Sequence, residues 1–267
     1  MKDMTQGNPV KEVLLFSVPM ILASVFQQMY NAVDSIIVGQ FVGANALAAV
    51  GAAFPAMFLA MSVLIGITMG VQIIISQLFG AGEHERMRAT FATSIISLMI
   101  LVVIASVIGY FASGTILELM NTPPEIIADS KAYLDEIFKG LIFMFLYNLY
   151  TSVLRGVGDS KTPLYFLIIS SILNIVLDLV YVIQFGMGVR GVAVATVQSQ
   201  AVSVILCIIY TNIRIPLFRL GLKDLRVDFG ILRTVLRFGI PTAIQQSISA
   251  IGSMLVQGLV NSFGATA

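Results

Sequence analysis

Two aspartates, Asp34 and Asp178, are the only acidic residues within the long apolar stretches of this sequence. An ionised carboxylate inside a bilayer is costly unless it is paired, protonated or hydrated, so such acids usually mark a functional site. Asn174 precedes Asp178 by four residues and therefore shares its face of a helix. Two buried acids with an amide beside one of them are typical of a cation or proton site.

The chemistry of such a site follows from its carboxylates. Removal from water disfavours their charged form, and a second carboxylate nearby adds repulsion. A proton or a hard cation such as Na⁺ relieves that repulsion, and amide and hydroxyl oxygens complete the shell of a cation. A site that is charged when empty and neutral when loaded can drive a conformational cycle.

The composition places this chemistry in a membrane. The chain is 58% hydrophobic and 11% charged, with a mean hydropathy of +0.95, whereas soluble domains are roughly 45–50% apolar and about 25% charged. The net charge of +1 gives no indication of a nucleic acid partner. A single cysteine, Cys207, and a single histidine, His84, exclude a disulfide framework and disfavour a Cys/His metal centre. We expect a lipid-embedded protein with no cofactor other than its coupling ion.

Seven segments reach the roughly 20 apolar residues that a membrane helix needs. They are Val13–Phe41, Ala52–Phe79, Phe91–Ser113, Phe138–Leu154, Pro163–Phe185, Val192–Asn212 and Thr234–Phe263. Turn-forming residues separate several of them, at Gly80–Gly82, Asn121–Pro124, Gly156–Asp159 and Gly186–Gly188. The first run is too long for a cleavable signal. A short amphipathic segment, Ala128–Glu136, is expected at the outer surface. The sequence therefore predicts an all-α polytopic membrane protein.

The distribution of basic residues predicts the orientation. With the N-terminus in the cytoplasm, only Lys131, Lys139 and Arg190 face outward. The other basic residues face inward, as the positive-inside rule requires, and are Lys2, Lys11, Arg86, Arg88, Arg155, Lys161, Arg214, Arg219, Lys223, Arg226, Arg233 and Arg237. We expect a multi-pass protein of the cell (inner) membrane.

The seventh segment repeats the first at an offset of 222 residues. Matches include Phe16 with Phe238 and Pro19 with Pro241. The remaining matches, the last three after a one-residue gap, join Val13, Leu14, Val38, Phe41, Gly43, Ala44 and Ala46 to Val235, Leu236, Val260, Phe263, Gly264, Ala265 and Ala267. Six helices separate the two copies, so both copies point the same way, as in transporters built from parallel repeats. The alternative is a chance similarity between two apolar helices.

This repeat predicts the domain organisation. We expect an N-terminal six-helix lobe over 1–212, a basic cytoplasmic linker over 213–233, and the first helix of a second, incomplete lobe over 234–267. The chain would then be half of a twelve-helix transporter, and its missing C-terminal lobe would be its partner.

Helix geometry places several polar side chains at similar depth. At about 1.5 Å per residue, Asp34, Asn174, Asp178, Thr196 and Asn148 lie roughly 9–18 Å from the outer ends of their helices. A polar pocket within the bundle requires such an arrangement. The alternative is that Thr196 and Asn148 only hydrogen-bond neighbouring helices.

These residues occur in motifs that resemble the multidrug and toxic compound extrusion (MATE) family, in its DinF-like branch. The first is Tyr30-Asn31-Ala32-Val33-Asp34, followed by Val38-Gly39. The others are the loop 154–163, the pair Asn174 and Asp178 with the residues between them, and the segment 191–196. The likeness covers the whole chain but only the first half of the family's usual twelve helices.

The resemblance implies cation-coupled antiport, driven by Na⁺ or H⁺, that exports chemically varied and often cationic compounds by alternating access. It assigns the coupling site to Asp34, Asn174, Asp178 and Thr196, and the adjoining substrate cavity to Gln27, Tyr30 and Asn148. Pro19 matches the proline at which the first helix bends, although a static kink is the alternative. Val256 stands at the repeat position of Asp34, so coupling is expected in the first lobe.

Other functions are less compatible with the sequence. A lipid-linked precursor flippase of a related fold tends to carry several basic residues in its cavity, and no Lys or Arg lies mid-span here. The sequence shows no pair of a nucleophile and a base, and no set of metal ligands, that would indicate an intramembrane enzyme. A half-protein that does not transport by itself stays open.

The charge distribution generates a topology prediction. Single cysteines introduced at Gly82 or Lys223 should react with membrane-impermeant thiol reagents only from the cytoplasm, and one at Glu125 only from outside. Right-side-out and inverted vesicles provide the measurement. Labelling at Lys223 from outside would contradict the arrangement of six helices plus one.

Overall fold

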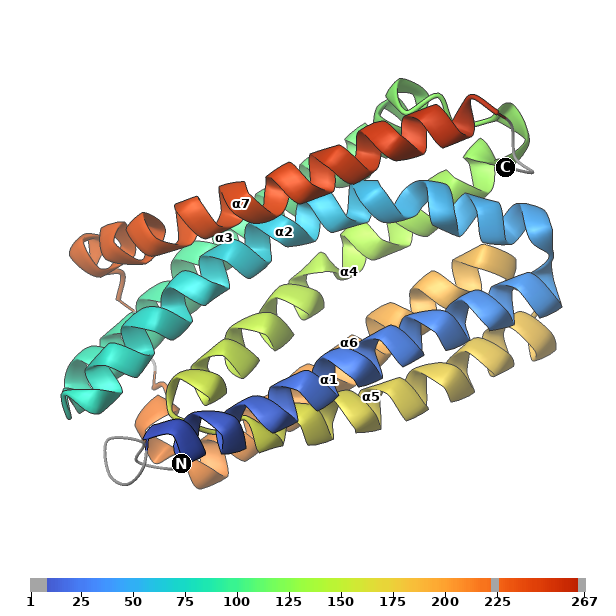
Figure 1. Cartoon of the computed structure of the whole chain (residues 1–267). Helices are drawn as coiled ribbons and strands as arrows, with labels where there is room; N and C mark the ends of the chain where they lie inside the picture. Colours follow the sequence, from blue (N-terminus) through green and yellow to red (C-terminus); the bar gives the residue numbers. More distant parts are fainter. Residues whose placement is uncertain (1–8, 222–225, 264–267) are drawn as a thin grey trace.

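The computed structural model describes residues 9–221 and 226–263. Lys2, Lys223 and the repeat matches at Gly264, Ala265 and Ala267 lie outside the described residues. Every described element is helical (Figure 1), which confirms the all-α class. The elements are α1 (Pro9–Ile37), η1 (Val38–Val42), α2 (Ala44–Gly80), α3 (His84–Leu119), α4 (Pro124–Gly156), α5 (Lys161–Leu179), η2 (Val180–Gln184), α6 (Gly188–Arg214), η3 (Pro216–Phe218) and α7 (Phe229–Asn261).

The helices end where the sequence carries turn chemistry. α2 ends at Gly80, α3 at Leu119 and α4 at Gly156, each at a predicted break. Residues with left-handed backbone angles, which favour glycine and asparagine, stand in the connections: Gly43, Gly82, Asn121, Gly158, Gly186 and Gly188.

Three helices are longer than their apolar segments. α2 begins at Ala44, α3 runs over His84–Leu119, and α4 begins at Pro124. The amphipathic segment Ala128–Glu136 is therefore the first part of α4 rather than a separate surface element. Polar residues such as Glu and Lys are good helix formers, so α3 and α4 continue beyond their apolar parts. The added part of α2, residues 44–51, is rich in alanine, the residue with the highest helix propensity.

By length and hydropathy, six of the described helices could cross a membrane. They are α1 to α6, with α1 and α5 extended by the π-helical turns η1 and η2. The seventh expected span also forms a helix, α7, which is long enough to cross a membrane. It is not among the six helices that are also apolar enough to do so. Its charged and amide side chains, among them Arg233, Arg237 and Gln245, account for the difference.

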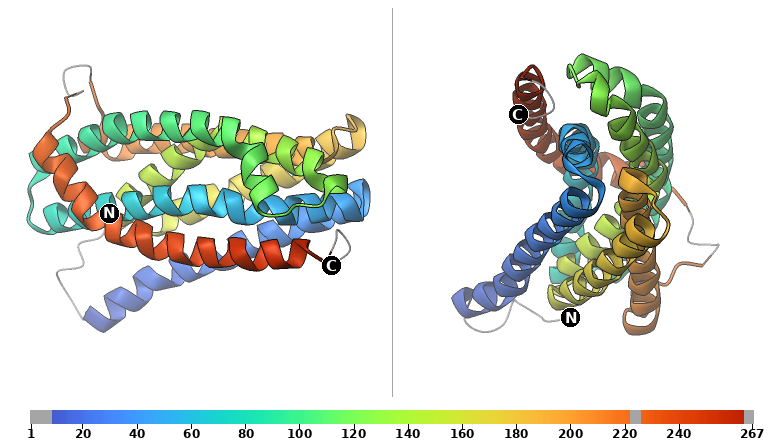
Figure 2. Two further views of the ribbon diagram at one scale, coloured as in Figure 1. Left: turned by 90° about the horizontal axis from the view of Figure 1, so that it is seen from above. Right: turned by 90° about the vertical axis from the view of Figure 1, so that its right-hand side faces the viewer.

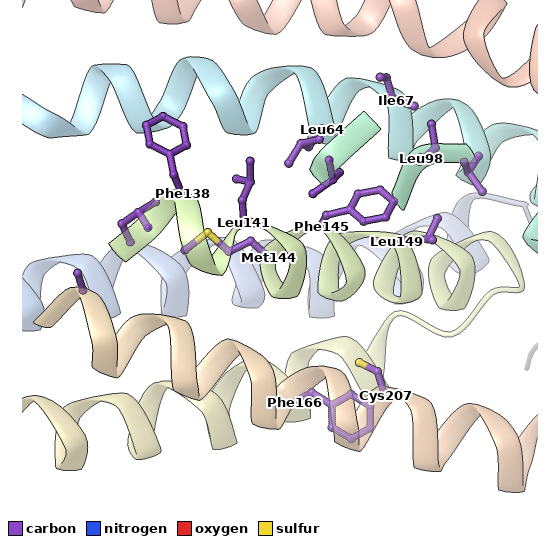
Figure 3. Close-up of a cluster of buried hydrophobic side chains, with 14 of the residues drawn as sticks. Leu64, Ile67, Leu98, Phe138, Leu141, Met144, Phe145, Leu149, Phe166 and Cys207 are labelled. Carbon is purple, nitrogen blue, oxygen red and sulfur yellow. The ribbon is translucent and has the colours of Figure 1, made fainter. Parts of the chain in front are cut away.

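α4 lies at the centre of the bundle. It packs against α2 and α3 on one side and α6 on the other, while α5 packs on α6 and α1 packs on α5 (Figure 2). Leucine, methionine and phenylalanine side chains fill the space between α4, α2 and α3 (Figure 3). α1 is the least buried of the six apolar helices, because its length contacts mainly α5.

α7 packs along α2 with the two backbones close together. An added Cβ at Gly70 would lie 2.6 Å from the carbonyl oxygen of Val235, and one at Gly66 would collide with the backbone of Ala243. Ser62 and Ser247 form a hydrogen bond across the same contact, with 3.1 Å between their Oγ atoms. Small residues spaced in this way allow membrane helices to approach closely. Assignment of α7 to a second lobe stays a prediction.

This contact generates a stability prediction. Gly66→Leu should push α7 away from α2 and lower the melting temperature in detergent, because overpacking costs about 1–3 kcal/mol. Gly51→Leu on the same helix is the matched control, since an added Cβ there meets no atom within 4 Å. Equal melting temperatures for the two variants would contradict the close α2–α7 contact.

Candidate functional site

The side chain of Asn174, on α5, joins the two membrane acids. Oriented by the hydrogen-bond network, its amide nitrogen donates to Asp34 Oδ1 at 2.8 Å and to Asp178 Oδ2 at 3.1 Å. Its oxygen accepts from the backbone nitrogen of Thr196 at 3.2 Å. Asn174 and Asp178 are fully buried, and Asp34 is half-buried. Three helices, α1, α5 and α6, therefore meet at one amide group.

The two carboxyl groups also lie within hydrogen-bonding reach of each other. Among the described residues, the recorded ion pairs lie at the ends of the bundle, and none involves Asp34 or Asp178. The second oxygen of Asp178, Oδ1, is buried without a hydrogen-bond donor. Two ionised carboxylates are not stable in such contact away from water, so the pair requires a proton or a bound cation.

Hydroxyl groups surround this amide and acid cluster. Thr196 Oγ1 lies 3.4 Å from the Tyr30 hydroxyl oxygen, and Tyr30 is also within hydrogen-bonding reach of Asp34. Thr196 itself is buried. The four residues predicted as the coupling site are thus brought together, with Tyr30 beside them.

π-helical turns follow both acids. η1 begins four residues after Asp34 and η2 begins two residues after Asp178, and the two turns contact each other. In each turn a backbone N–H bonds five residues back, as Gly43 does to Val38 at 3.0 Å. Single π-helical turns frequently occur at functional sites, and here they place the outer ends of α1 and α5 together.

Comparison with known proteins identifies the family. The sequence model of the MatE family matches residues 19–180, more than half of the chain. The chain belongs to the MATE family. It is 36% identical over 264 residues to the probable multidrug resistance protein YoeA of Bacillus subtilis (strain 168), covering 96% of this chain and 57% of that protein. It is 25% identical to the multidrug export protein MepA of Staphylococcus saprophyticus, covering 97% and 57%.

Solved MATE structures share the fold. An outward-facing multidrug resistance MATE family transporter matches with a TM-score of 0.82 and 28% identity, over 90% of this chain and 53% of that one. An inward-facing one matches with a TM-score of 0.79 and 26% identity, over 90% and 55%. The chain thus spans about half the length of the relatives it matches. These matches confirm the helical fold class and its half-length correspondence.

Sequence reasoning missed one residue near the acid pair. Tyr133, on α4, is buried and lies close enough to interact electrostatically with both Asp34 and Asp178. It belongs to the segment that we had expected at the outer surface. The sequence did contain a signal that Tyr133 is buried, because Ser130, Tyr133 and Ile137 share one helix face. All three are buried.

Two predicted cavity residues are not hydrogen-bonded to the acids. Gln27 donates to Asn31 at 3.4 Å, and Asn148 donates to the carbonyl oxygen of Met144 in its own helix at 2.8 Å. Their role in a substrate cavity stays a prediction. α1 continues through Pro19 without a break, and its bending also stays a prediction.

The amide of Asn174 can face the acid pair with either its nitrogen or its oxygen. In the orientation described above, its nitrogen donates to the carboxylates. Turned over, its nitrogen lies 3.4 Å from Thr196 Oγ1 and its oxygen faces the acids. An amide oxygen beside carboxylates is a ligand set for a hard cation. Both orientations of this amide are compatible with the positions of α1, α5 and α6 in the structure.

The geometry generates a stability prediction. Asp34→Asn keeps the shape of the side chain and removes one charge from the pair, so the melting temperature in detergent at neutral pH should stay equal or rise. Asn174→Leu should lower it, because hydrogen bonds to charged groups contribute about 1.5–3 kcal/mol each. Asn148→Leu is the matched amide deletion and should have the smaller effect. A marked loss of stability in Asp34→Asn would instead assign that acid a structural role.

Proposed function

We propose that this chain supplies the first lobe of a cation-coupled antiporter that exports small, chemically varied and often cationic drugs. The observation that carries the proposal is the convergence of Asp34 and Asp178 on the amide of Asn174. A buried pair without a basic partner changes its net charge when a cation enters. Asp34, Asn174, Asp178 and Thr196 are the proposed coupling site.

Coupling follows from the positions of the two acids. Asp34 lies on α1 and Asp178 on α5, so repulsion between the empty carboxylates acts between two helices. Loading by Na⁺ or H⁺ removes that repulsion and draws α1 toward α5. A ligand shifts a conformational equilibrium only through such a difference in interaction free energy between the states.

The comparisons support this proposal at the level of the family. Its named relatives include multidrug resistance and export proteins, and its fold matches a transporter in both outward-facing and inward-facing form. Alternating access needs a second wall for the central cleft, which the second half of a relative would supply. We propose that lobe as the partner of this one, and the lipid bilayer as its surroundings.

The orientation is part of the proposal. The end of the bundle that carries Arg86, Arg155 and Arg214 would face the cytoplasm of a cell membrane, in agreement with the positive-inside rule. The opposite end carries the ion pairs of Lys131 with Asp135 and of Arg190 with Glu136.

The test is drug export by the chain completed to the length of its relatives, reconstituted in liposomes. Export is driven by an imposed Na⁺ or H⁺ gradient. Asp34→Asn and Asp178→Asn should abolish gradient-driven export, because an amide cannot exchange a proton or carry the charge. Asn174→Ala should be mild under H⁺ coupling and severe under Na⁺ coupling, where an oxygen ligand is lost. Export at the wild-type rate by Asp34→Asn, with expression matched, would refute the coupling site.

The 267-residue chain by itself should export no drug above background, because one wall of the cleft is absent. Dye efflux from cells that express it measures this. Robust export by the purified chain alone in liposomes would overturn the two-lobe proposal.

A further inference from the structure

Buried polar residues continue from the acid pair along the inner face of α6, which packs against both α5 and α4; this row is here called the α5–α6 seam. On α6 they recur every three or four residues and so share one face of the helix. They are Thr196, Ser199, Ser203, Cys207 and Thr211, all buried. On the α5 side, Ser170 lies one turn before Asn174 and donates to the carbonyl oxygen of Ser199 at 3.2 Å. The seam leads toward the end of the bundle that carries Arg214.

Two hydroxyls in this seam lack the hydrogen bond that membrane helices normally provide. Serine and threonine in helices usually donate to a carbonyl oxygen one turn earlier, as Ser171 does to Leu167 at 2.8 Å. Ser203 and Thr211 are each 1% exposed, yet their hydroxyl oxygens have no partner. Gln200 Oε1, on the same helix, is also buried and unpartnered. Buried polar atoms are almost always satisfied, so these oxygens call for water.

The spacing suits water. Successive polar groups on this face are about one turn, or roughly 5.4 Å, apart, and two hydrogen bonds of about 2.8 Å each, joined by one water, cover that distance. The thiol of Cys207 stands between the hydroxyls of Ser203 and Thr211. The seam ends at Asp159 in the α4–α5 connection. Its Oδ2 accepts from Thr162 at 2.7 Å and from Tyr210 at 3.1 Å.

We propose that the α5–α6 seam is a proton path between the acid pair and the end of the bundle that carries Asp159. The inference rests on the proposed function and specifies its ion. One carboxylic acid of the pair releases H⁺ to the first water. Each hydroxyl or water then accepts one proton and releases another, and the aqueous phase at Asp159 gains one. No electrons move. The acid pair can then exchange a proton with the aqueous phase at Asp159 without being open to the drug cleft.

The described residues of the seam offer no ligand set for a metal cation such as Na⁺. The ring of Phe166, on α5, packs edge-on against Tyr210 of α6, with 5.8 Å between the ring centroids. Between Asp178 and Asp159, no other carboxylate of the described residues is recorded along this contact. Hydrogen-bonded water in single file conducts protons there, whereas Na⁺ finds no carboxylate to balance its charge on the way.

The native cysteine provides the test, because Cys207 is the only cysteine of the chain and lies in the seam. Ag⁺ is small enough to travel through single-file water and binds the thiol with release of H⁺. The folded chain in membranes is exposed to Ag⁺ for set times and unfolded, and its remaining thiol is labelled with a fluorescent maleimide. Cys207 should react with Ag⁺ in the folded chain but resist a bulky maleimide.

Thr211→Val should slow the Ag⁺ reaction at least tenfold, because it removes the hydroxyl next along the seam while keeping the side-chain volume. Thr68→Val is the matched control, since Thr68 is equally buried on α2 and its hydroxyl bonds within its own helix. Its rate should equal that of the wild type.

Three results would overturn the path: no reaction of folded Cys207 with Ag⁺, equal rates for Thr211→Val and the wild type, or equal access of the bulky maleimide, which would mean local unfolding. Each of these leaves the coupling site standing if Asp34→Asn still abolishes export. Conversely, wild-type export by Asp34→Asn would refute coupling while leaving a hydrated seam.

Discussion

A pair of carboxyl groups that must share one small space away from water sets the conditions for the rest of this lobe. The pair is held by a single amide, and that amide is fully buried. The helices that bring the groups together depend on polar contacts of their own, such as the bond from Ser170 to Ser199 between α5 and α6. π-helical turns after both acids join the outer ends of α1 and α5. Because burial disfavours separate charges, the structure tolerates this pair only with a proton or a cation, and that requirement is what makes the site useful.

The packing determines which helix can move when the charge of the acid pair changes. α4 is enclosed by α2, α3 and α6, with large apolar side chains filling the space between them, and such close-packed interiors transmit force without deforming. α1 is different, because it is the least buried of the apolar helices and rests mainly on α5. One acid of the pair lies on this loosely held helix and the other on α5, which is packed against the bundle. A change in their repulsion therefore moves α1 first. Pro19, which removes one backbone hydrogen bond from α1, lies in the helix that bears this force.

Much of this arrangement could be predicted from the sequence because two of its signals are strong. Long apolar runs separated by Gly and Pro predicted the helices, and the scarcity of acids within them singled out Asp34 and Asp178. What failed were features that depend on tertiary packing. Charged end parts of α3 and α4 are helical although they are not apolar, and Tyr133 was placed at the surface because a charged helix face concealed the buried one. Hydropathy also could not tell that α7 would lie at backbone distance from α2 through Gly66 and Gly70. The orientation of the Asn174 amide could not be predicted from the sequence, since it depends on which atoms of three helices meet.

The two repeat-related helices show how one sequence pattern can serve two roles. α1 carries Asp34, whereas the corresponding position of α7 is Val256, an exposed residue. α1 has few close contacts, but α7 packs along α2 and also contacts α3. Asp228 donates its backbone N–H to Thr93, Ser247 bonds to Ser62, and Asn261 donates to the carbonyl oxygen of Met120. The two helices thus differ in packing as well as in charge: the helix that carries the acid is loosely held, while its counterpart, which carries none, is packed against α2. Under the proposed coupling, a change in charge at the acid pair would act on the loosely held helix.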